Sequence, residues 1–514
     1  MGGLGYGRGV AVATRAPLGA VPVAPGMAQF RVWAPHARAV AIRVDGRDDG
    51  LRESEDGVWE GEVAAAPGDD YRFVLDGHDA WPDPCSRWQP EGVRGPSRLL
   101  DTSAFELAAG PELRLEELVV YELHVGTFSP EGTFTGVIPR LRGLRELGIT
   151  AIELMPVATF PGERGWGYDG LYTFAPHPAY GGPAGLVRLV DAAHREGLAV
   201  LLDVVYNHVG PGNEALTAFA PYFTDRLGQT PWGDALDYAR TGVREWAIQN
   251  AELWVREYGI DGLRLDAVHA VLDDSPRHLL AELGERVRAV GRRALVISEM
   301  GVPDFRPLRD WGHDAMWLDT LHHALHVALT GERDGYYAPY EGSLGRVAAE
   351  LARPERARLV ACAQNHDQVG NRALGDRLPP ERLRVAAAVV LFSRFTPLLF
   401  QGEEYGEEAP FQFFTDHPDP ATADATREGR RREFAGFAGF EGEVPDPQDV
   451  ATFERSKLRP RDPDPLYREL LRLRRELPDE LAVAVDEERR TLVLRRGRAM
   501  LDVDFANLRV ELHT

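Results

Sequence analysis

Acidic, histidine and arginine residues gather at the ends of four short apolar segments of the sequence. They stand near no cysteine cluster and no HExxH spacing, so the pattern suits proton transfer and nucleophilic attack better than zinc binding. The residues concerned are, in chain order, Asp203 and His208, Arg264 and Asp266, Glu299, and His366 and Asp367.

Two carboxylates that share one site can divide the work of glycoside hydrolysis. One attacks the anomeric carbon, while the other is held protonated by its surroundings and gives a proton to the leaving oxygen. Arg264 lies two residues before Asp266 and, by strand periodicity, on the same face, so it can keep that aspartate ionised as the nucleophile. Glu299 is then the expected proton donor, about 5 Å away across one pocket.

A third acid, Asp367, can act with His208 and His366 on the hydroxyl groups of the sugar. Such contacts strengthen as the ring flattens toward an oxocarbenium ion. Each acid taken alone could equally be a cap or a solvated residue at a strand end. The set argues against that alternative, because all its members fall at the same end of their segments.

The elements that must position these groups are short, almost continuously apolar runs separated by amphipathic stretches of helical period. Runs of this kind are typical of parallel strands buried on both faces, and eight of them predict a closed (β/α)8 TIM barrel whose strand ends meet at one mouth. A final barrel helix is expected at 466–477. The runs are 118–125, 151–157, 199–208, 262–268, 294–300, 315–319, 357–366 and 397–406.

Alternating apolar and polar residues over 28–77, broken by Gly, Pro and Asp, predict a small antiparallel β-sandwich ahead of the barrel. The resulting multidomain α/β chain ends in a short C-terminal β region. The expected divisions are a flexible segment at 1–27, an immunoglobulin-like, carbohydrate-binding-like β-sandwich at 28–110, the catalytic barrel at 111–480 and terminal strands at 481–514.

Net charge and cysteine content limit the classes of partner and the cell compartment that we expect. The 514 residues include 58 basic and 80 acidic side chains, for a formal charge of −22, which opposes nucleic acid or an anionic membrane as a partner. Only Cys85 and Cys362 occur, and no 18-residue uncharged apolar run is present, so we expect a cytoplasmic protein. The sequence leaves the oligomeric state open.

The strand-end segments resemble the signature segments of the α-amylase superfamily, glycoside hydrolase family 13. An early stretch, FRVWAPHARAVAIRV (30–44), is similar to the subgroup with an N-terminal β-sandwich. The stretches LTGERDGYYA (329–338) and EGRRREFAGFAGF (428–440) resemble its trehalose-releasing branch. The four signature-like segments are DVVYNH (203–208), GLRLDAVH (262–269), ISE (297–299) and QNHDQVGN (364–371).

This resemblance implies roles for individual residues. Asp266 would be the nucleophile, Glu299 the general acid/base and Asp367 the stabiliser of the transition state. The reaction implied is hydrolysis, with retention, of the α-1,4 bond next to the terminal trehalose of maltooligosyl trehalose, an α-glucan substrate, with no cofactor. Further substrate contacts are expected from Tyr168, which would stack on the sugar, and from Asp203, His208, Arg264, His366, Asp319, His322 and His323.

Two segments depart from the superfamily branch. Thr320 and Leu321 stand where a second acid is usual before the paired histidines, and Met300 to Val302 replace small polar residues after Glu299. Both lie on loops that can reach the leaving sugar, so hydrolysis is better supported than trehalose specificity. A metal site at His322, His323 and His326 is disfavoured, since no neighbouring Cys or Glu completes it by spacing.

Two alternative functions remain. A 1,4-α-glucan branching or α-1,6 debranching enzyme would use the same barrel and acids, and the segments 329–338 and 428–440 favour the trehalose-releasing branch over it. A non-catalytic glycan-binding protein is the second, and the presence of all three acids disfavours it.

Overall fold

The computed structural model describes residues 15–291, 294–434 and 442–514. The chain begins with two small antiparallel sheets whose inward side chains, including Phe30, Ile42 and Phe73, are fully buried. The first sheet contains β1 (Gly19–Ala24), β2 (Met27–Trp33), β6 (Val58–Ala64) and β5 (Arg52–Glu53). The second contains β4 (Arg47–Gly50), β3 (Val40–Val44), β7 (Asp70–Leu75), β8 (Ala80–Trp81) and β9 (Ser97–Arg98).

The sandwich starts earlier than the sequence pattern indicates. Strand β1 pairs with β2 over residues that were expected to belong to a flexible segment. Pro22 weakens the strand pattern there, and it is accommodated because β1 is an edge strand with only one neighbour. The rest of that expectation, residues 1–14, lies outside the described part of the chain.

The predicted barrel is confirmed. Eight parallel strands close into a ring, with β10 pairing β21, and each lies within or overlaps one of the apolar runs. The strands are β10 (Val120–Leu123), β11 (Ala151–Leu154), β14 (Ala199–Val204), β17 (Gly262–Leu265), β18 (Leu295–Glu299), β19 (Ala315–Trp317), β20 (Leu359–Cys362) and β21 (Thr396–Phe400).

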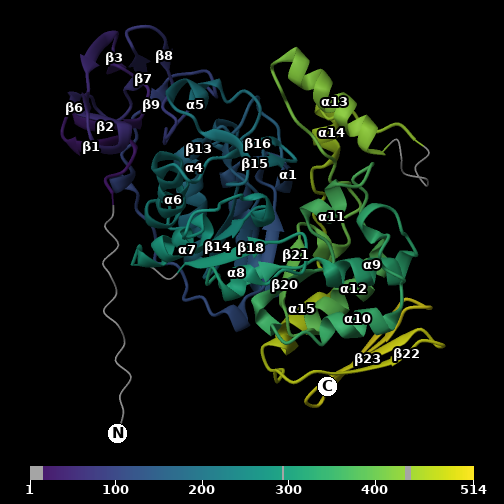
Figure 1. Ribbon diagram of the computed structural model, residues 1–514. Coiled ribbons are helices and arrows are strands. Elements are labelled where there is room, and N and C mark those ends of the chain that lie inside the picture. Colours follow the sequence, from purple (N-terminus) through teal and green to yellow (C-terminus); the bar gives the residue numbers. More distant parts are fainter. Residues whose placement is uncertain (1–14, 292–293, 435–441) are drawn as a thin grey trace.

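Helices surround the barrel in Figure 1. Residues 137–148, which resemble a single helix in sequence, form short pieces: α2 (Phe134–Val137), η4 (Ile138–Arg140) and α3 (Leu141–Leu147). Pro139 lies in the middle piece and has no N–H to continue an α-helical ladder. The longer helices are α4 (Gly182–Arg195), α6 (Thr241–Arg256), α7 (Leu279–Ala289), α9 (Thr320–Thr330), α10 (Leu344–Leu351), α12 (Pro380–Phe392), α13 (Pro420–Phe434) and α15 (Pro465–Arg474).

Loops at the barrel mouth carry shorter elements. The segment after β11 forms β12 (Ala158–Thr159) and β13 (Tyr172–Pro176), and the segment after β14 forms α5 (Glu214–Phe219), β15 (Phe223–Thr230) and β16 (Gly233–Leu236). Other short helices after barrel strands are α1 (Val125–Phe128), η6 (Val268–Ala270), α8 (Arg306–Arg309), α11 (His366–Gly370) and η9 (Glu403–Tyr405), and α14 (Val450–Arg455) follows α13.

The terminal strands form one antiparallel sheet, drawn in yellow in Figure 1. Its strands are β22 (Ala482–Asp486), β23 (Thr491–Arg496), β24 (Ala499–Asp504) and β25 (Arg509–His513). Leu492, Leu494 and Leu501 are fully buried, and the sheet contacts α10 and α12. The alternation of buried and exposed residues along β23 and β24 is what one covered face requires.

Arg496 fastens this sheet to the barrel. Its Nη1 donates to the carbonyl oxygen of Ser393 at 2.8 Å, and its Nε to that of Pro478 at 2.8 Å, in a buried setting. We expect Arg496→Met to lower the free energy of unfolding by about 2–4 kcal/mol, because buried carbonyls lose a charged donor. Urea denaturation measures this. Arg495→Met, at an exposed position of the same strand, is the control; equal effects of the two changes would contradict the expectation.

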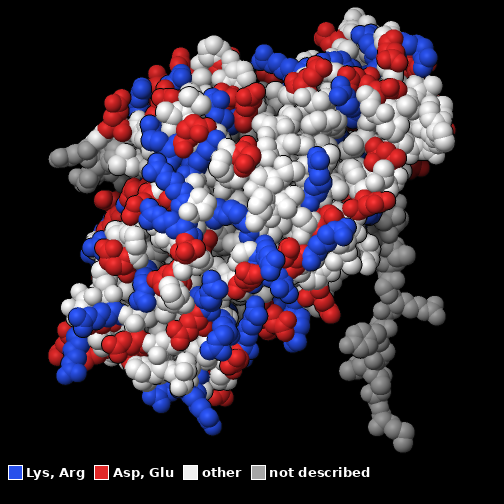
Figure 2. All heavy atoms as spheres, turned by 180° about the vertical axis from the view of Figure 1, so that it is seen from behind, with Lys and Arg blue, Asp and Glu red and all other residues white. Residues whose placement is uncertain are grey.

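Acidic and basic side chains are interspersed over the face shown in Figure 2. Within the described ranges, no helix is long and apolar enough to cross a bilayer. The cytoplasmic location stays a prediction.

Candidate active site

The polar strand-end residues meet at one end of the barrel. Strands β14, β17 and β18 are neighbours, and their register places Asp203 opposite Arg264. Asp203 and Arg264 are buried inside the barrel, whereas the side chains of Asp266 and Glu299 are 11% and 14% exposed. Asp266 and Glu299 therefore reach solvent above a buried layer that holds them.

Arg264 is the hub of this layer. Its Nη1 donates to Asp203 Oδ2 at 2.7 Å and to Asp266 Oδ1 at 2.8 Å. Its Nη2 lies 3.9 Å from Glu299 Oε2. The guanidinium also lies over the ring of Trp317, 4.4 Å from its centroid. Asp266 and Glu299 thus lie against one cation and share one site, as the sequence predicts; their separation of about 5 Å stays a prediction.

Asn207 holds the other oxygen of Asp266. Its Nδ2 donates to Asp266 Oδ2 at 2.6 Å and to the backbone oxygen of the same residue at 2.9 Å. With Arg264 on Oδ1, both carboxylate oxygens of Asp266 accept hydrogen bonds. These contacts hold the side chain of Asp266 in a fixed orientation.

Glu299 is held in its protonated form at neutral pH. Burial raises its pKa to about 8, since the nearby Arg264 lowers the pKa less than burial and the charges of Asp266 and Asp367 raise it. Its Oε2 accepts the N–H of Ala267 at 2.5 Å. Ala267 has a left-handed backbone, with φ of +39°, which is unusual for a residue other than glycine and is found mainly at functional sites. The strained turn directs a donor at the acid.

His366 lies between two carboxylates. Its Nδ1 is 2.5 Å from Glu122 Oε1, and its Nε2 is 3.4 Å from Asp367 Oδ1. Burial disfavours the charged imidazole, but Asp367 and Glu122 outweigh it and raise the pKa of His366 to about 10. The ring is therefore a cation at neutral pH.

Tyr168 joins the two sides of the site. Its hydroxyl donates to Asp203 Oδ2 at 2.7 Å and lies 2.7 Å from His366 Nε2. Its ring packs on that of His366, with centroids 5.2 Å apart and an interplanar angle of 26°. Burial raises the pKa of Asp203 to about 7 despite Arg264. Tyr168 is fixed by its neighbours before any sugar arrives.

Glu122 is a positioning residue for His366, and we expect Glu122→Gln to reveal it. Without that carboxylate, the pKa of His366 should fall by at least about one unit and kcat/KM by roughly tenfold, because a buried cation loses its partner. Histidine NMR across a pH series gives the first quantity and steady-state kinetics the second. Glu62→Gln, on the sandwich, should change neither; an unaltered His366 titration in Glu122→Gln would contradict the role.

His208 lies beside Asn207 at the predicted site, and its expected contact with the sugar stays a prediction. Its Nδ1 is directed at Asn207 Oδ1, and its ring stacks on Trp232 with centroids 4.4 Å apart. Burial lowers its pKa, although Asp266 and Asp169 oppose the shift. A neutral imidazole beside Asn207 helps to orient the amide that holds Asp266, and Trp232 covers it.

Three substrate contacts were predicted at the start of α9, and two of them, Asp319 and His323, lie beside Gln368. Asp319 Oδ2 accepts from Gln368 Nε2 at 3.0 Å, and burial with the charge of Asp367 raises the pKa of Asp319 to about 6. His323 is partly exposed, and its Nε2 lies 3.5 Å from the same amide nitrogen.

His322 does not match its predicted role. It is buried, and its ring nitrogens lie 2.7 Å from Ala363 O and 3.0 Å from Tyr337 Oη. Neither nitrogen is left for a sugar hydroxyl, so His322 packs and positions rather than binds. In the part of the chain that the structure describes, no group of three His, Cys, Asp or Glu residues is arranged to hold a metal ion.

The two segments whose sequences depart from the family pattern contact different surroundings. The hydroxyl of Thr320 donates to Glu350 on α10 at 2.7 Å rather than to a catalytic acid, and Leu321 is buried. After Glu299, Met300 is buried but Val302 is exposed. The replacement of polar residues after Glu299 therefore leaves an apolar side chain on the surface of that loop.

Sequence reasoning missed several functional neighbours. Glu122 could have been noticed, because it is a carboxylate inside an otherwise apolar strand, and Asn207, because it directly precedes His208. Trp317 and Gln368 follow from no local pattern, since they act through contacts across the barrel mouth. Trp232 lies on a hairpin loop whose course the sequence does not specify.

Comparison with known proteins agrees with this geometry. Residues 91–221 match the model "Alpha amylase, catalytic domain", and residues 17–89 match "Carbohydrate-binding module 48 (Isoamylase N-terminal domain)". A closed parallel barrel with an N-terminal sandwich and three acids at its mouth defines a glycosidase of the alpha-amylase class.

Proteins with similar sequences indicate which family of alpha-amylase-class enzymes this chain belongs to. A malto-oligosyltrehalose trehalohydrolase of Deinococcus radiodurans is 43% identical, over 90% of this chain and 84% of its own length. The chain belongs to the malto-oligosyltrehalose trehalohydrolase family. A crystal structure described as a putative alpha amylase from Salmonella typhimurium superimposes with a TM-score of 0.85 at 38% identity, covering 95% of this chain and 93% of that one. A 1,4-alpha-glucan branching enzyme of Salinibacter ruber is 33% identical over only 47% of this chain and 45% of its own.

Proposed function

We propose that this protein is a retaining glycosidase that hydrolyses the α-1,4 bond beside the terminal trehalose of maltooligosyl trehalose and releases trehalose. The observation that carries the proposal is a pair of carboxyl groups that both lie beside the guanidinium of Arg264. Asp266 accepts hydrogen bonds from Arg264 and Asn207 through its two oxygens, whereas burial raises the pKa of Glu299 to about 8. One is arranged to attack and the other to donate a proton.

In the first step, Asp266 attacks the anomeric carbon while Glu299 gives its proton to the glycosidic oxygen, so that trehalose leaves as a neutral sugar. The bond from carbon to the leaving oxygen breaks, and a covalent glucosyl ester to Asp266 forms. Asp203 and Arg264 stay in the buried layer and keep the nucleophile in place.

In the second step, the ionised Glu299 takes a proton from water, and the water oxygen attacks the anomeric carbon from the face that the leaving group vacated. The ester bond to Asp266 breaks and Glu299 is protonated again. Two displacements restore the original configuration.

The sugar ring is flattened and positively charged in the transition state of each step. Asp367, 34% exposed and held by Asn371 Nδ2 at 3.0 Å, is placed to accept bonds from sugar hydroxyls as that charge develops. The protonated His366 beside it supplies a donor whose charge Glu122 balances.

Trehalose as the leaving group rests on the family to which the chain belongs. Asp319 and His323, which lie beside Gln368, are the contacts that we expect for that sugar. Comparing products from maltooligosyl trehalose and from plain maltooligosaccharides of equal length tests the assignment. We expect trehalose as the first product and much slower turnover of the plain chains.

The same assay separates the alternatives. Branch formation detected by iodine staining of amylose, without trehalose release, would contradict the proposal in favour of glucan transfer. Binding of both substrates without turnover would favour a glycan-binding protein.

A further inference from the structure

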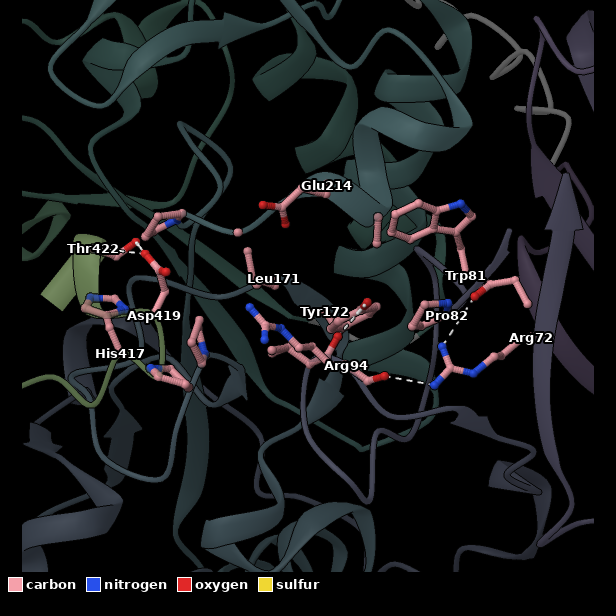
Figure 3. Close-up of a pocket in the computed structure, with 17 residues that line it drawn as sticks. Arg72, Trp81, Pro82, Arg94, Leu171, Tyr172, Glu214, His417, Asp419 and Thr422 are labelled. Atoms are coloured by element: carbon pink, nitrogen blue, oxygen red, sulfur yellow. Dashed lines mark hydrogen bonds between the residues drawn. The ribbon is translucent and has the colours of Figure 1, made fainter. Parts of the chain in front are cut away.

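A cavity of about 530 Å³ lies where the N-terminal sandwich, the barrel loops and the start of α13 meet (Figure 3). Its volume falls in the range of sites that hold small ligands, about 300–1,000 Å³. Trp81 and Pro82 reach it from the sandwich, Leu171 and Tyr172 from the loop after β11, and Asp419 and Thr422 from the start of α13. The three catalytic acids are not among the residues that line it.

One side of the cavity is apolar and partly aromatic. Trp81 is partly exposed, and Tyr172 is fixed by a hydrogen bond from its hydroxyl to the carbonyl oxygen of Val93 at 3.1 Å. Pro82 and Leu171 complete this wall. Rigid rings and proline faces are surfaces on which the C–H face of a sugar ring can pack with little loss of side-chain freedom.

The other side carries polar groups with free capacity. Arg94 and Glu214 are exposed, and among the described residues their side chains make no hydrogen bond or ion pair. Asp419 accepts the N–H of Thr422 at 2.8 Å and its hydroxyl at 2.7 Å, both through Oδ2, and within the described part of the chain no hydrogen bond reaches its Oδ1. Charged groups of this kind make strong hydrogen bonds to hydroxyls.

The charges of the cavity balance. Arg72, held by the carbonyl oxygen of Arg94 at 2.8 Å, and Arg94 itself are opposed by Glu214 and Asp419. A phosphorylated or cationic ligand would meet one unfavourable pair for each favourable one. A neutral, polyhydroxylated ligand uses donors and acceptors of both kinds.

The cavity shares its loops with the active site. Leu171 follows Tyr168 by three residues, and Glu214 follows His208 by six. His417, which also lines the cavity, has its Nε2 3.8 Å from Asp169 Oδ2, next to Tyr168. A chain of sugars held at the acids can therefore extend toward this junction along the same two loops.

We propose that this junction cavity is an α-glucan-binding site, which holds a few glucose units away from the catalytic acids. The identity of the ligand as a glucan rests on the proposed function. The bound units come either from the far end of the substrate under attack or from a separate glucan strand. Both sources offer the same chemistry, and experiment distinguishes them.

The test uses the full chain. In a Glu299→Gln background, which binds without turnover, Trp81→Ala and the isosteric Glu214→Gln are compared by affinity electrophoresis in amylose gels. We expect the apparent Kd for amylose to rise at least fivefold in each, with residual binding at the acids. Val23→Ala and Glu53→Gln, exposed positions of the same sandwich, are the matched controls and should stay within twofold of the parent.

Kinetics of the active chain assign the source. A KM that rises only for substrates of six or more glucose units identifies the far end of the substrate, whereas weaker amylose binding with KM unchanged at every length identifies a separate strand. Amylose binding within twofold of the parent in both variants overturns the proposal. If the parent releases no trehalose, the proposed function is wrong but the proposed glucan site is not affected, because the gel comparison does not depend on turnover.

Discussion

Replacing Asp266 with alanine is expected to lower kcat on maltooligosyl trehalose by at least about 10⁴-fold, while glucan binding persists. The carboxylate that Arg264 and Asn207 hold is the atom group arranged to form the covalent intermediate, and water in its place has neither the charge nor the position. Single-turnover kinetics and calorimetric titration with maltoheptaose measure the two quantities. Retained turnover would show that another group attacks.

Two comparisons sharpen this result. Asp274→Ala removes an exposed acid on a nearby loop and should leave kcat within twofold. Azide added to Asp266→Ala should partly restore cleavage, since a small anion can occupy the space of the lost carboxylate. The product would then be the β-glucosyl azide, because one displacement inverts the anomeric carbon. An α-configured product would contradict attack from the side of Asp266.

Glu299→Gln is expected to reduce kcat by about 10²–10⁴-fold, the usual contribution of a positioned general acid. The amide keeps the size of the side chain and can still accept the N–H of Ala267, but it has no proton to give. Glucosides with good leaving groups need that proton less. In the first step, Glu299→Gln should therefore reduce the cleavage of aryl glucosides whose phenol has a low pKa by less than it reduces the cleavage of maltooligosyl trehalose. An equal loss for both would contradict the role.

The pH dependence follows from the same residue. Glu299 must be protonated when the glycosidic bond breaks, and burial raises its pKa to about 8. Activity should therefore be retained below that value and be lost as the pH rises through about 8, with a tenfold fall for each further unit. In Glu299→Gln this alkaline limb should vanish. A limb of the same midpoint in the variant would assign the titration to another group.

The sequence predicted the barrel well because its strands are buried on both faces. Runs such as those around Leu201 and Ile297 have no polar face, and little else but parallel strands between helices fits that pattern at eight places. The site followed from the same logic, since acids that end such runs must meet at the barrel mouth.

Contacts between distant segments were harder to foresee. The pairing of Glu122 with His366 joins residues 244 positions apart, and nothing local in either segment specifies it. His322 was misassigned because a histidine beside predicted substrate residues gives the same pattern whether its ring faces a sugar or the interior. Burial and the bond to Ala363 decided that question. The edge strand β1 was hidden by Pro22, whose missing N–H matters only where a second neighbour is needed.

The left-handed backbone at Ala267 also limits how this protein can change over generations. Such a conformation costs about 1–2 kcal/mol for a residue with a Cβ, against a total native stability of roughly 5–15 kcal/mol. Valine, isoleucine or threonine there would add crowding to a margin that is already thin, so few mutations at this position can survive selection. Side chains larger than that of alanine are therefore expected to be rare at position 267, and gains in heat tolerance from bulkier residues are expected at turns that do not contact Glu299.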